Sequence, residues 1–189
     1  LFLGLIVSLA GIGALTFKPG VDLEHSVGLH WLFAARGPLE APKGVVIVAL
    51  DEQSAHKLGV SSRPRDWPRN LHAQLVRYLA QAGARIIVFD MTFETPSAQA
   101  SHDDELAAAI LQAGNVAIAS SMQREVIALA GAGGKSIGSA LIERPTPPIA
   151  SIEKAARGHA PFLLPKGPRV NVYWTFANGA ADAPTLPVL

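Results

Sequence analysis

The chain has 189 residues, of which 49% are apolar and 16% charged, and its formal net charge is +1. This length allows one domain with a substantial core and hardly two. The near-neutral charge, without a basic stripe, argues against nucleic-acid binding. Because cysteine is absent, structural disulfides, thiolate nucleophiles and cysteine-based zinc sites are excluded.

The N-terminal residues 1–17 are apolar and uncharged, and Lys18-Pro19-Gly20 ends the run. A helix of this length spans about 25 Å, slightly less than the hydrocarbon core of a bilayer at about 30 Å. We predict a transmembrane helix over 1–17 and expect the sequence to begin within that span. A cleaved signal peptide and a buried core helix are the alternatives. A rough apolar stripe predicts a second helix over 22–36, ending at Gly37.

A short apolar run follows at residues 45–50 (VVIVAL), and Asp51 comes directly after it. Continuous apolar runs rich in β-branched residues are typical of parallel strands that are buried on both faces. We therefore expect a buried strand at 45–50. Residues 60–68, rich in proline and polar groups, predict a loop.

A helix followed by a strand is expected twice in succession. In the first unit Asn70 is the expected N-cap, Gly83 ends the helix, and 85–89 form the strand. In the second, Ser101 and Asp104 form a capping-box-like start, Gly114 ends the helix, and 116–119 form the strand. Strands joined through helices predict right-handed crossovers. We therefore predict a layered α/β domain over 20–189, with a largely parallel sheet and flanking helices, preceded by one transmembrane helix.

The remainder of the chain gives weaker signals. Residues 124–129 suggest a strand, 130–140 a glycine-rich loop, and 170–176 a late strand at a sheet edge. Three prolines, at 145, 147 and 148, argue against regular structure around them.

Two aspartates provide the candidate ligand site. Asp51 and Asp90 each follow a predicted parallel strand, and ligands of open α/β sheets bind at that edge. The carboxylates could hold a cation, an amine or a sugar hydroxyl, joined by Glu94 and by the pair Arg65 and Arg69. The alternative is that each aspartate caps its own turn or pairs with an arginine.

Other chemistry has little support in the sequence. Residues 131–136 end in Gly-Lys-Ser, but Leu129 stands where a phosphate-binding loop needs its first glycine. The six histidines form no metal-binding array. The serines at 120 and 121 lack the elbow or lysine of a nucleophile. We therefore expect no catalytic residue, no metal site and no cofactor.

Several motifs in order resemble the type-two CHASE domain, over roughly residues 20–180. They are the helix ending at Arg36-Gly37, the strand Val45 to Asp51, Trp67-Pro68-Arg69-Asn70, Gly83 to Asp90, and the Asp103-Asp104 helix leading to Gly114-Asn115-Val116. The family usually shows an acidic Asp-Gly turn followed by arginine. The corresponding stretch here, 158–169, lacks the acidic residue, which puts a role for that turn in doubt.

The resemblance implies a sensory domain of a bacterial receptor, outside the cytoplasmic membrane on the periplasmic side. Such domains are typically followed by three membrane helices and a cytoplasmic nucleotide cyclase, histidine kinase or serine/threonine kinase. The expected partners are the membrane, a small-molecule or ion ligand or a periplasmic protein, and a second copy in a homodimer. A ligand-free dimerisation or docking module and, remotely, a metal-assisted hydrolase are the competing hypotheses.

Overall fold

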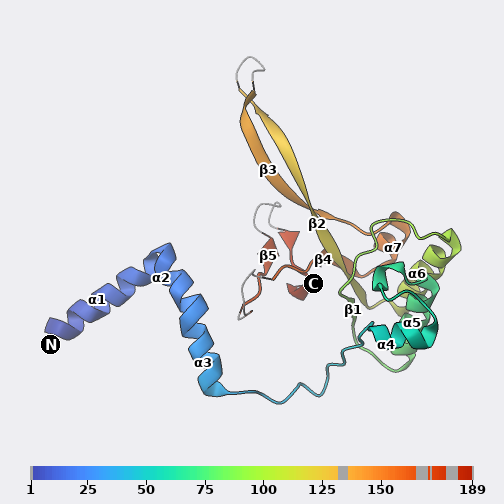
Figure 1. Cartoon of the computed structure of the whole chain (residues 1–189), viewed down its shortest axis with the longest axis horizontal. Helices are drawn as coiled ribbons and strands as arrows, with labels where there is room; N and C mark the ends of the chain where they lie inside the picture. Colours follow the sequence, from blue (N-terminus) through green and yellow to red (C-terminus); the bar gives the residue numbers. More distant parts are fainter. Residues whose placement is uncertain (1, 132–135, 165–169, 171, 178–182, 189) are drawn as a thin grey trace. The chain divides into compact units, whose positions relative to one another are not determined.

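The computed structural model describes residues 2–131, 136–164, 170, 172–177 and 183–188. The chain divides into two units, one formed by 1–48 with 166–172 and the other by 49–165 with 173–189. Figure 1 traces both along the chain.

The first unit consists mainly of consecutive helices. They are α1 (Phe2–Thr16), α2 (Lys18–Leu23), the π-helical turn η1 (Glu24–Gly28) and α3 (Leu29–Arg36). Gly37, at a φ of 73°, ends α3 in the left-handed region that glycine tolerates. Both helices expected at the N-terminus are therefore confirmed as helices. Among the described residues, however, no helix is both long enough and apolar enough to cross a membrane.

The prediction of a strand at residues 45–50 is wrong. This stretch has no regular secondary structure, and residues 45–49 are exposed, with Ile47 at 89% and Val46 at 81%. β-branched residues fit a sheet well, but their propensity does not supply a neighbouring strand. The helix that follows, α4 (Glu52–Leu58), was not expected from the sequence.

The second unit contains both predicted helix-and-strand pairs. Helix α5 (Arg69–Gln81) leads to β1 (Ile87–Phe89), and α6 (Ala100–Ala113) leads to β2 (Val116–Ala130). Gly83 and Gly114 lie past the helix ends at φ values of 84° and 68°, as expected.

The predicted starts of these two helices are wrong. The N-cap positions are Pro68 for α5 and Gln99 for α6, and neither side chain makes a capping bond. Asn70 and Ser101 therefore lie inside their helices.

Strand β2 is the centre of a four-stranded sheet (Figure 1). Its first half pairs in parallel with β1 and with β4 (Gly158–Pro161), while its second half pairs antiparallel with β3 (Ser136–Thr146). β2 forms ten antiparallel residue pairs with β3, but only three parallel pairs with β1 and four with β4. The fold is mixed α/β, but the sheet is mixed and mostly antiparallel, so the largely parallel sheet expected from the sequence is wrong.

The β2–β3 hairpin explains this correction. Residues 136–140, expected in a loop, and Pro145, expected to prevent regular structure, belong to β3. Pro145 pairs with Met122 of β2, and β3 is at the edge of the sheet. An edge strand tolerates proline because the N–H that proline lacks is not needed on its outer side. The phosphate-loop candidate at 131–136 lies largely outside the described residues.

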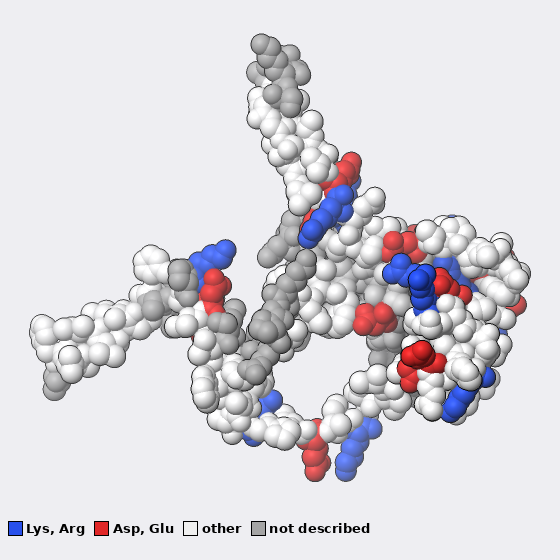
Figure 2. Space-filling model, in the orientation of Figure 1, with Lys and Arg blue, Asp and Glu red and all other residues white. Residues whose placement is uncertain are grey.

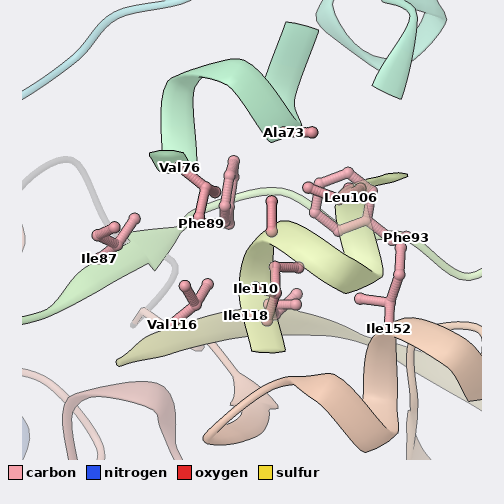
Figure 3. Packing of buried hydrophobic residues seen from close by; sticks show 11 residues of the cluster. Ala73, Val76, Ile87, Phe89, Phe93, Leu106, Ile110, Val116, Ile118 and Ile152 are labelled. Atoms are coloured by element: carbon pink, nitrogen blue, oxygen red, sulfur yellow. The ribbon is translucent and has the colours of Figure 1, made fainter. Parts of the chain in front are cut away.

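The main core lies between the parallel strands and helices α5, α6 and α7 (Ala150–Ala155) (Figure 3). Alternate residues of β2 face these helices, so Val116 and Ile118 are fully buried. Burying each such side chain contributes about 1.5–3 kcal/mol. The other face of the sheet carries a smaller cluster formed by Ala117, Ala119, Ala160 and Leu186.

The C-terminal part of the second unit contains two very short strands, β5 (Phe176–Ala177) and β6 (Ala183–Pro184), and a turn of 3-10 helix, η3 (Leu186–Val188). β5 pairs antiparallel with β6. Of the late strand expected at 170–176, residues 172–174 have no regular structure and 171 lies outside the described residues, so β5 begins only at Phe176.

Candidate functional site

A short loop between α4 and α5 is anchored at both of its ends. The Trp67 indole N–H donates to the carbonyl of Ser61 at 2.6 Å, closing a loop that contains the 3-10 turn η2 (Pro64–Asp66). Trp67 itself is buried. This bond fixes the course of the backbone that carries Arg63 and Arg65.

Aromatic rings hold this loop against the segment that follows β1. Trp67 stacks on the His72 ring, with centroids 6.3 Å apart, and His72 meets the edges of Phe89 and Phe93 at 6.1 and 5.8 Å. His72 is almost fully buried. Burial, together with the charge of Arg69, lowers the pKa of His72 to about 4, so the ring is neutral at physiological pH.

A buried ion pair ties α5 to α6 and to the segment after β1. The Arg69 guanidinium donates to the Asp103 carboxylate at 2.6 Å and also to the carbonyl of Thr95. The other oxygen of Asp103 accepts the backbone N–H of Ser97 at 3.0 Å. Burial alone would raise the pKa of Asp103, but the Ser97 hydrogen bonds and Arg69 outweigh it and lower that pKa.

A solvent-open hollow of about 550 Å³ lies between this loop and the end of β1. Such a volume is within the range of small-molecule sites. Its charged groups are two guanidinium groups and one carboxylate. Within the described residues none of these three groups forms an ion pair. The lining residues are Ser62, Arg63, Pro64, Arg65, Asp90, Met91 and Thr92.

Of the five residues proposed for the ligand site from the sequence, Asp90, directly after β1, and Arg65 line this hollow. Asp51 is exposed and accepts the backbone N–H of Ser54 at 2.8 Å, capping α4; the hydrogen bonds from Ser54 lower its pKa. Arg69 is engaged with Asp103. Asp51 thus makes the local capping contact that was the alternative interpretation, whereas Arg69 is held by a distant carboxylate.

Glu94 is different, because its Oε1 atom is buried and has no hydrogen-bond partner within the described part of the chain. Such atoms are uncommon in folded proteins, and Glu94 is not among the residues that line the hollow. The sequence also missed Arg63. The signal available there was the arginine-proline alternation Arg63-Pro64-Arg65, which places two cations on one tight turn.

A serine, a histidine and a glutamate form a chain elsewhere in the second unit. Ser120 Oγ lies 2.9 Å from His159 Nδ1, and His159 Nε2 lies 3.4 Å from Glu153 Oε1. The order is that of a hydrolase triad. However, Ser120 is only 6% exposed, so its hydroxyl is not presented to a substrate. This series of three side chains links β2, β4 and α7 rather than forming a reactive site.

Among the described residues, no three His, Cys, Asp or Glu side chains are placed to share a metal ion. The second unit is thus an α/β domain with a solvent-open hollow, whose mainly apolar lining includes two arginines and one aspartate.

A family profile for the CHASE2 domain matches residues 4–179, so the chain belongs to the CHASE2 family. CHASE2 domains are extracytoplasmic sensory domains and typically non-catalytic. No curated protein and no solved structure matches the chain.

Proposed function

We propose that this chain is the ligand-sensing module of a bacterial transmembrane receptor. In this proposal residues 1–17 belong to a membrane anchor, 20–189 form the periplasmic domain, and the signal passes to a cytoplasmic nucleotide cyclase or kinase that is not part of this sequence. Membership of a family of extracytoplasmic sensors supports the assignment. The uncharged, apolar sequence of α1 supports the anchor.

The hollow at the end of β1 is the observation that carries ligand binding. Arg63 and Arg65 offer donors suited to a carboxylate or phosphate group, and Asp90 offers an acceptor for an amine or hydroxyl. A ligand with an acidic group at one end and a donor at the other matches this arrangement.

The contacts beneath the hollow suggest how binding is relayed. Arg69 reaches both α6, through Asp103, and the segment after β1, through Thr95. A ligand that draws the loop at 61–67 toward Asp90 would therefore act on α5, α6 and β1 together. It transmits a signal only by binding one of two arrangements more tightly, and we propose that these are arrangements of a homodimer.

A thermal-shift screen of the chain tests the site. The library holds amino acids, organic acids, sugars, nucleotides and divalent cations. We expect a concentration-dependent rise in Tm with a compound that carries an acidic group, because a ligand of the folded state stabilises it. Asp90→Asn or Arg63→Gln with Arg65→Gln should abolish the rise, while the exposed Asp104→Asn should preserve it. A rise unchanged in all variants would contradict the proposed site.

A ligand-free dimerisation or docking module is the second candidate, and the exposed apolar hairpin favours it. It predicts no shift with any compound in the library, together with self-association of the chain. The outcome of the screen therefore separates the two proposals.

A further inference from the structure

The far half of the β2–β3 hairpin, here called the arm, consists of residues 123–130 of β2 and 136–143 of β3. Figure 1 shows it extending beyond the parallel part of the sheet within the second unit. Between Glu125 and Glu143 the described residues of the arm carry no charge. Figure 2 shows the same division on one face, with charged side chains near the base of the arm and none on its described surface beyond.

The two faces of the arm differ in exposure. Strand register places Arg124 opposite Glu143, Val126 opposite Leu141, and Ala128 opposite Ser139 on one face. We call this the outer face. Val126 is 68% exposed and Leu141 is 61% exposed. On the other face Ile127 and Ile142 are half-buried.

An arm of this kind is poorly stabilised on its own. Two-stranded ribbons are marginal in water, and exposed large apolar side chains on a flat strand favour association. Within the described residues, β3 has no neighbour other than β2. The outer face therefore combines apolar side chains with a ribbon that gains stability from being covered.

We propose that the outer face is a self-association surface, covered by the outer face of a second copy of this chain. This inference gives the dimer of the proposed function a surface, and it stands whether or not the hollow binds a ligand. The two copies pack face to face about a two-fold axis that runs along the arm.

The register of the hairpin supports this partner. A two-fold along the arm places β2 of one copy over β3 of the other, so each residue faces the residue type with which it pairs in its own chain. Val126 then faces Leu141 of the partner subunit, and Arg124 faces Glu143 of the partner subunit. Arg124 and Glu143 form an ion pair of 2.6 Å within one chain. Because the two side chains have opposite charges, the contacts that the two-fold axis creates between the copies are attractive rather than repulsive.

The other face fits the same operation less well. Its register pairs Glu125 with Ile142 and Gln123 with Arg144. A two-fold along the arm would place the Glu125 carboxylate on Ile142 of the partner subunit, which desolvates a charge without a partner. The outer face is therefore the self-complementary one.

The size of the surface sets the expected strength. Eight residues per strand give a face about 27 Å long and about 10 Å wide, whereas a stable interface buries about 800 Å² per partner. The arm alone supports a weak dimer, which forms at high concentration or when the chains are held together on one membrane.

Cysteine cross-linking tests the geometry, because the chain contains no cysteine of its own. Val126→Cys and Leu141→Cys chains of different mass are mixed at about 1 mM and treated with a short bis-maleimide. We expect the mixed product to exceed both same-variant products several-fold. Gln123→Cys mixed with Arg144→Cys, a cross-strand pair on the other face, is the matched control and should give little product. Equal yields in all mixtures, or more product from the control, would overturn the proposal.

Charge reversal provides a second test, in which the two cysteines stay the same and only the charges beside them change. Arg124→Glu places like charges across the interface, so it should lower the cross-linking yield between Val126→Cys and Leu141→Cys chains several-fold. Adding Glu143→Arg to the same chains should restore it. Circular dichroism monitors folding throughout. If neither the single nor the double reversal changes the cross-linking yield, the assigned pairing is contradicted.

Discussion

The two halves of strand β2 have opposite surroundings. Residues 116–120 lie between β1 and β4 and are all buried, whereas 123–126 in the arm are all exposed. The chain continues from one environment to the other without a break in the strand. Val116 and Val126 make the contrast concrete, because one is fully buried and the other is 68% exposed.

The difference shows that strand formation and core formation are separate properties of this sequence. The first half is held by helices α5, α6 and α7 as well as by its neighbouring strands. The second half is held by one neighbouring strand and by cross-strand pairs such as Arg124 with Glu143. Exposed pairs of this kind contribute about 0.2–1 kcal/mol each. The rest of the second unit, here called the body, therefore has a packed core of its own, whereas the arm is held mainly by its own cross-strand pairs.

Breaking the buried ion pair between α5 and α6 should have the largest effect on stability. Asp103→Ala leaves the buried Arg69 guanidinium without its carboxylate, so the free energy of unfolding should fall by about 3–5 kcal/mol. Denaturant unfolding followed by circular dichroism measures it. Arg124→Ala, which removes an exposed pair from the arm, is the control and should cost under about 1 kcal/mol. Similar losses from both would contradict the contrast.

Acid should lower the free energy of unfolding through protonation of His72. The pKa of His72 is about 4 in the folded chain against 6.5 for the free side chain. Between these values the unfolded state binds more protons, so the free energy of unfolding decreases as pH falls from 6.5 toward 4. Denaturant unfolding should show a loss of about 2–3 kcal/mol between about pH 7.5 and about pH 4.5. His72→Leu should remove most of this pH dependence; an undiminished dependence would assign it to other groups.

Two identical substitutions on one strand compare the halves directly. Val116→Ala removes two buried methyl groups and leaves a cavity, so it should lower the free energy of unfolding by about 2 kcal/mol. Urea unfolding in dilute solution is the measurement. A loss below about 0.5 kcal/mol would show that this half of β2 is less tightly packed than its burial indicates.

Val126→Ala should give the smallest effect. In dilute solution the exposed side chain contributes little, so the free energy of unfolding should change by less than about 0.5 kcal/mol. The same substitution should nevertheless weaken self-association at about 1 mM, measured by sedimentation. A large loss of stability in dilute solution would mean that the arm is packed within its own chain.

The sequence predicted those parts of the fold that depend on local signals. Gly83 and Gly114 ended helices as expected, because the left-handed position after a helix favours glycine. Asp90 was expected at the end of a parallel strand, and it lines the hollow. Each of these features is encoded within a few residues of where it occurs.

Features that depend on distant partners were missed. Arg69 pairs with Asp103, which lies 34 residues away, so no local pattern distinguished a structural arginine from a ligand-binding one. The apolar run at 45–50 resembled a buried strand, but burial requires neighbours that the run itself does not specify. Pro145 was taken as a barrier to β-structure, whereas an edge strand accommodates it.

Hydrogen exchange at two protein concentrations tests most directly whether the arm is completed by a second copy. In dilute solution, amides at 123–129 should exchange much faster than those at 117–119, because the arm opens locally. Raising the concentration from about 10 µM to about 1 mM should slow exchange in the arm and leave 117–119 unchanged, since only the arm gains a partner. Exchange in the arm that is independent of concentration, or as slow as in the body at both concentrations, would contradict the account.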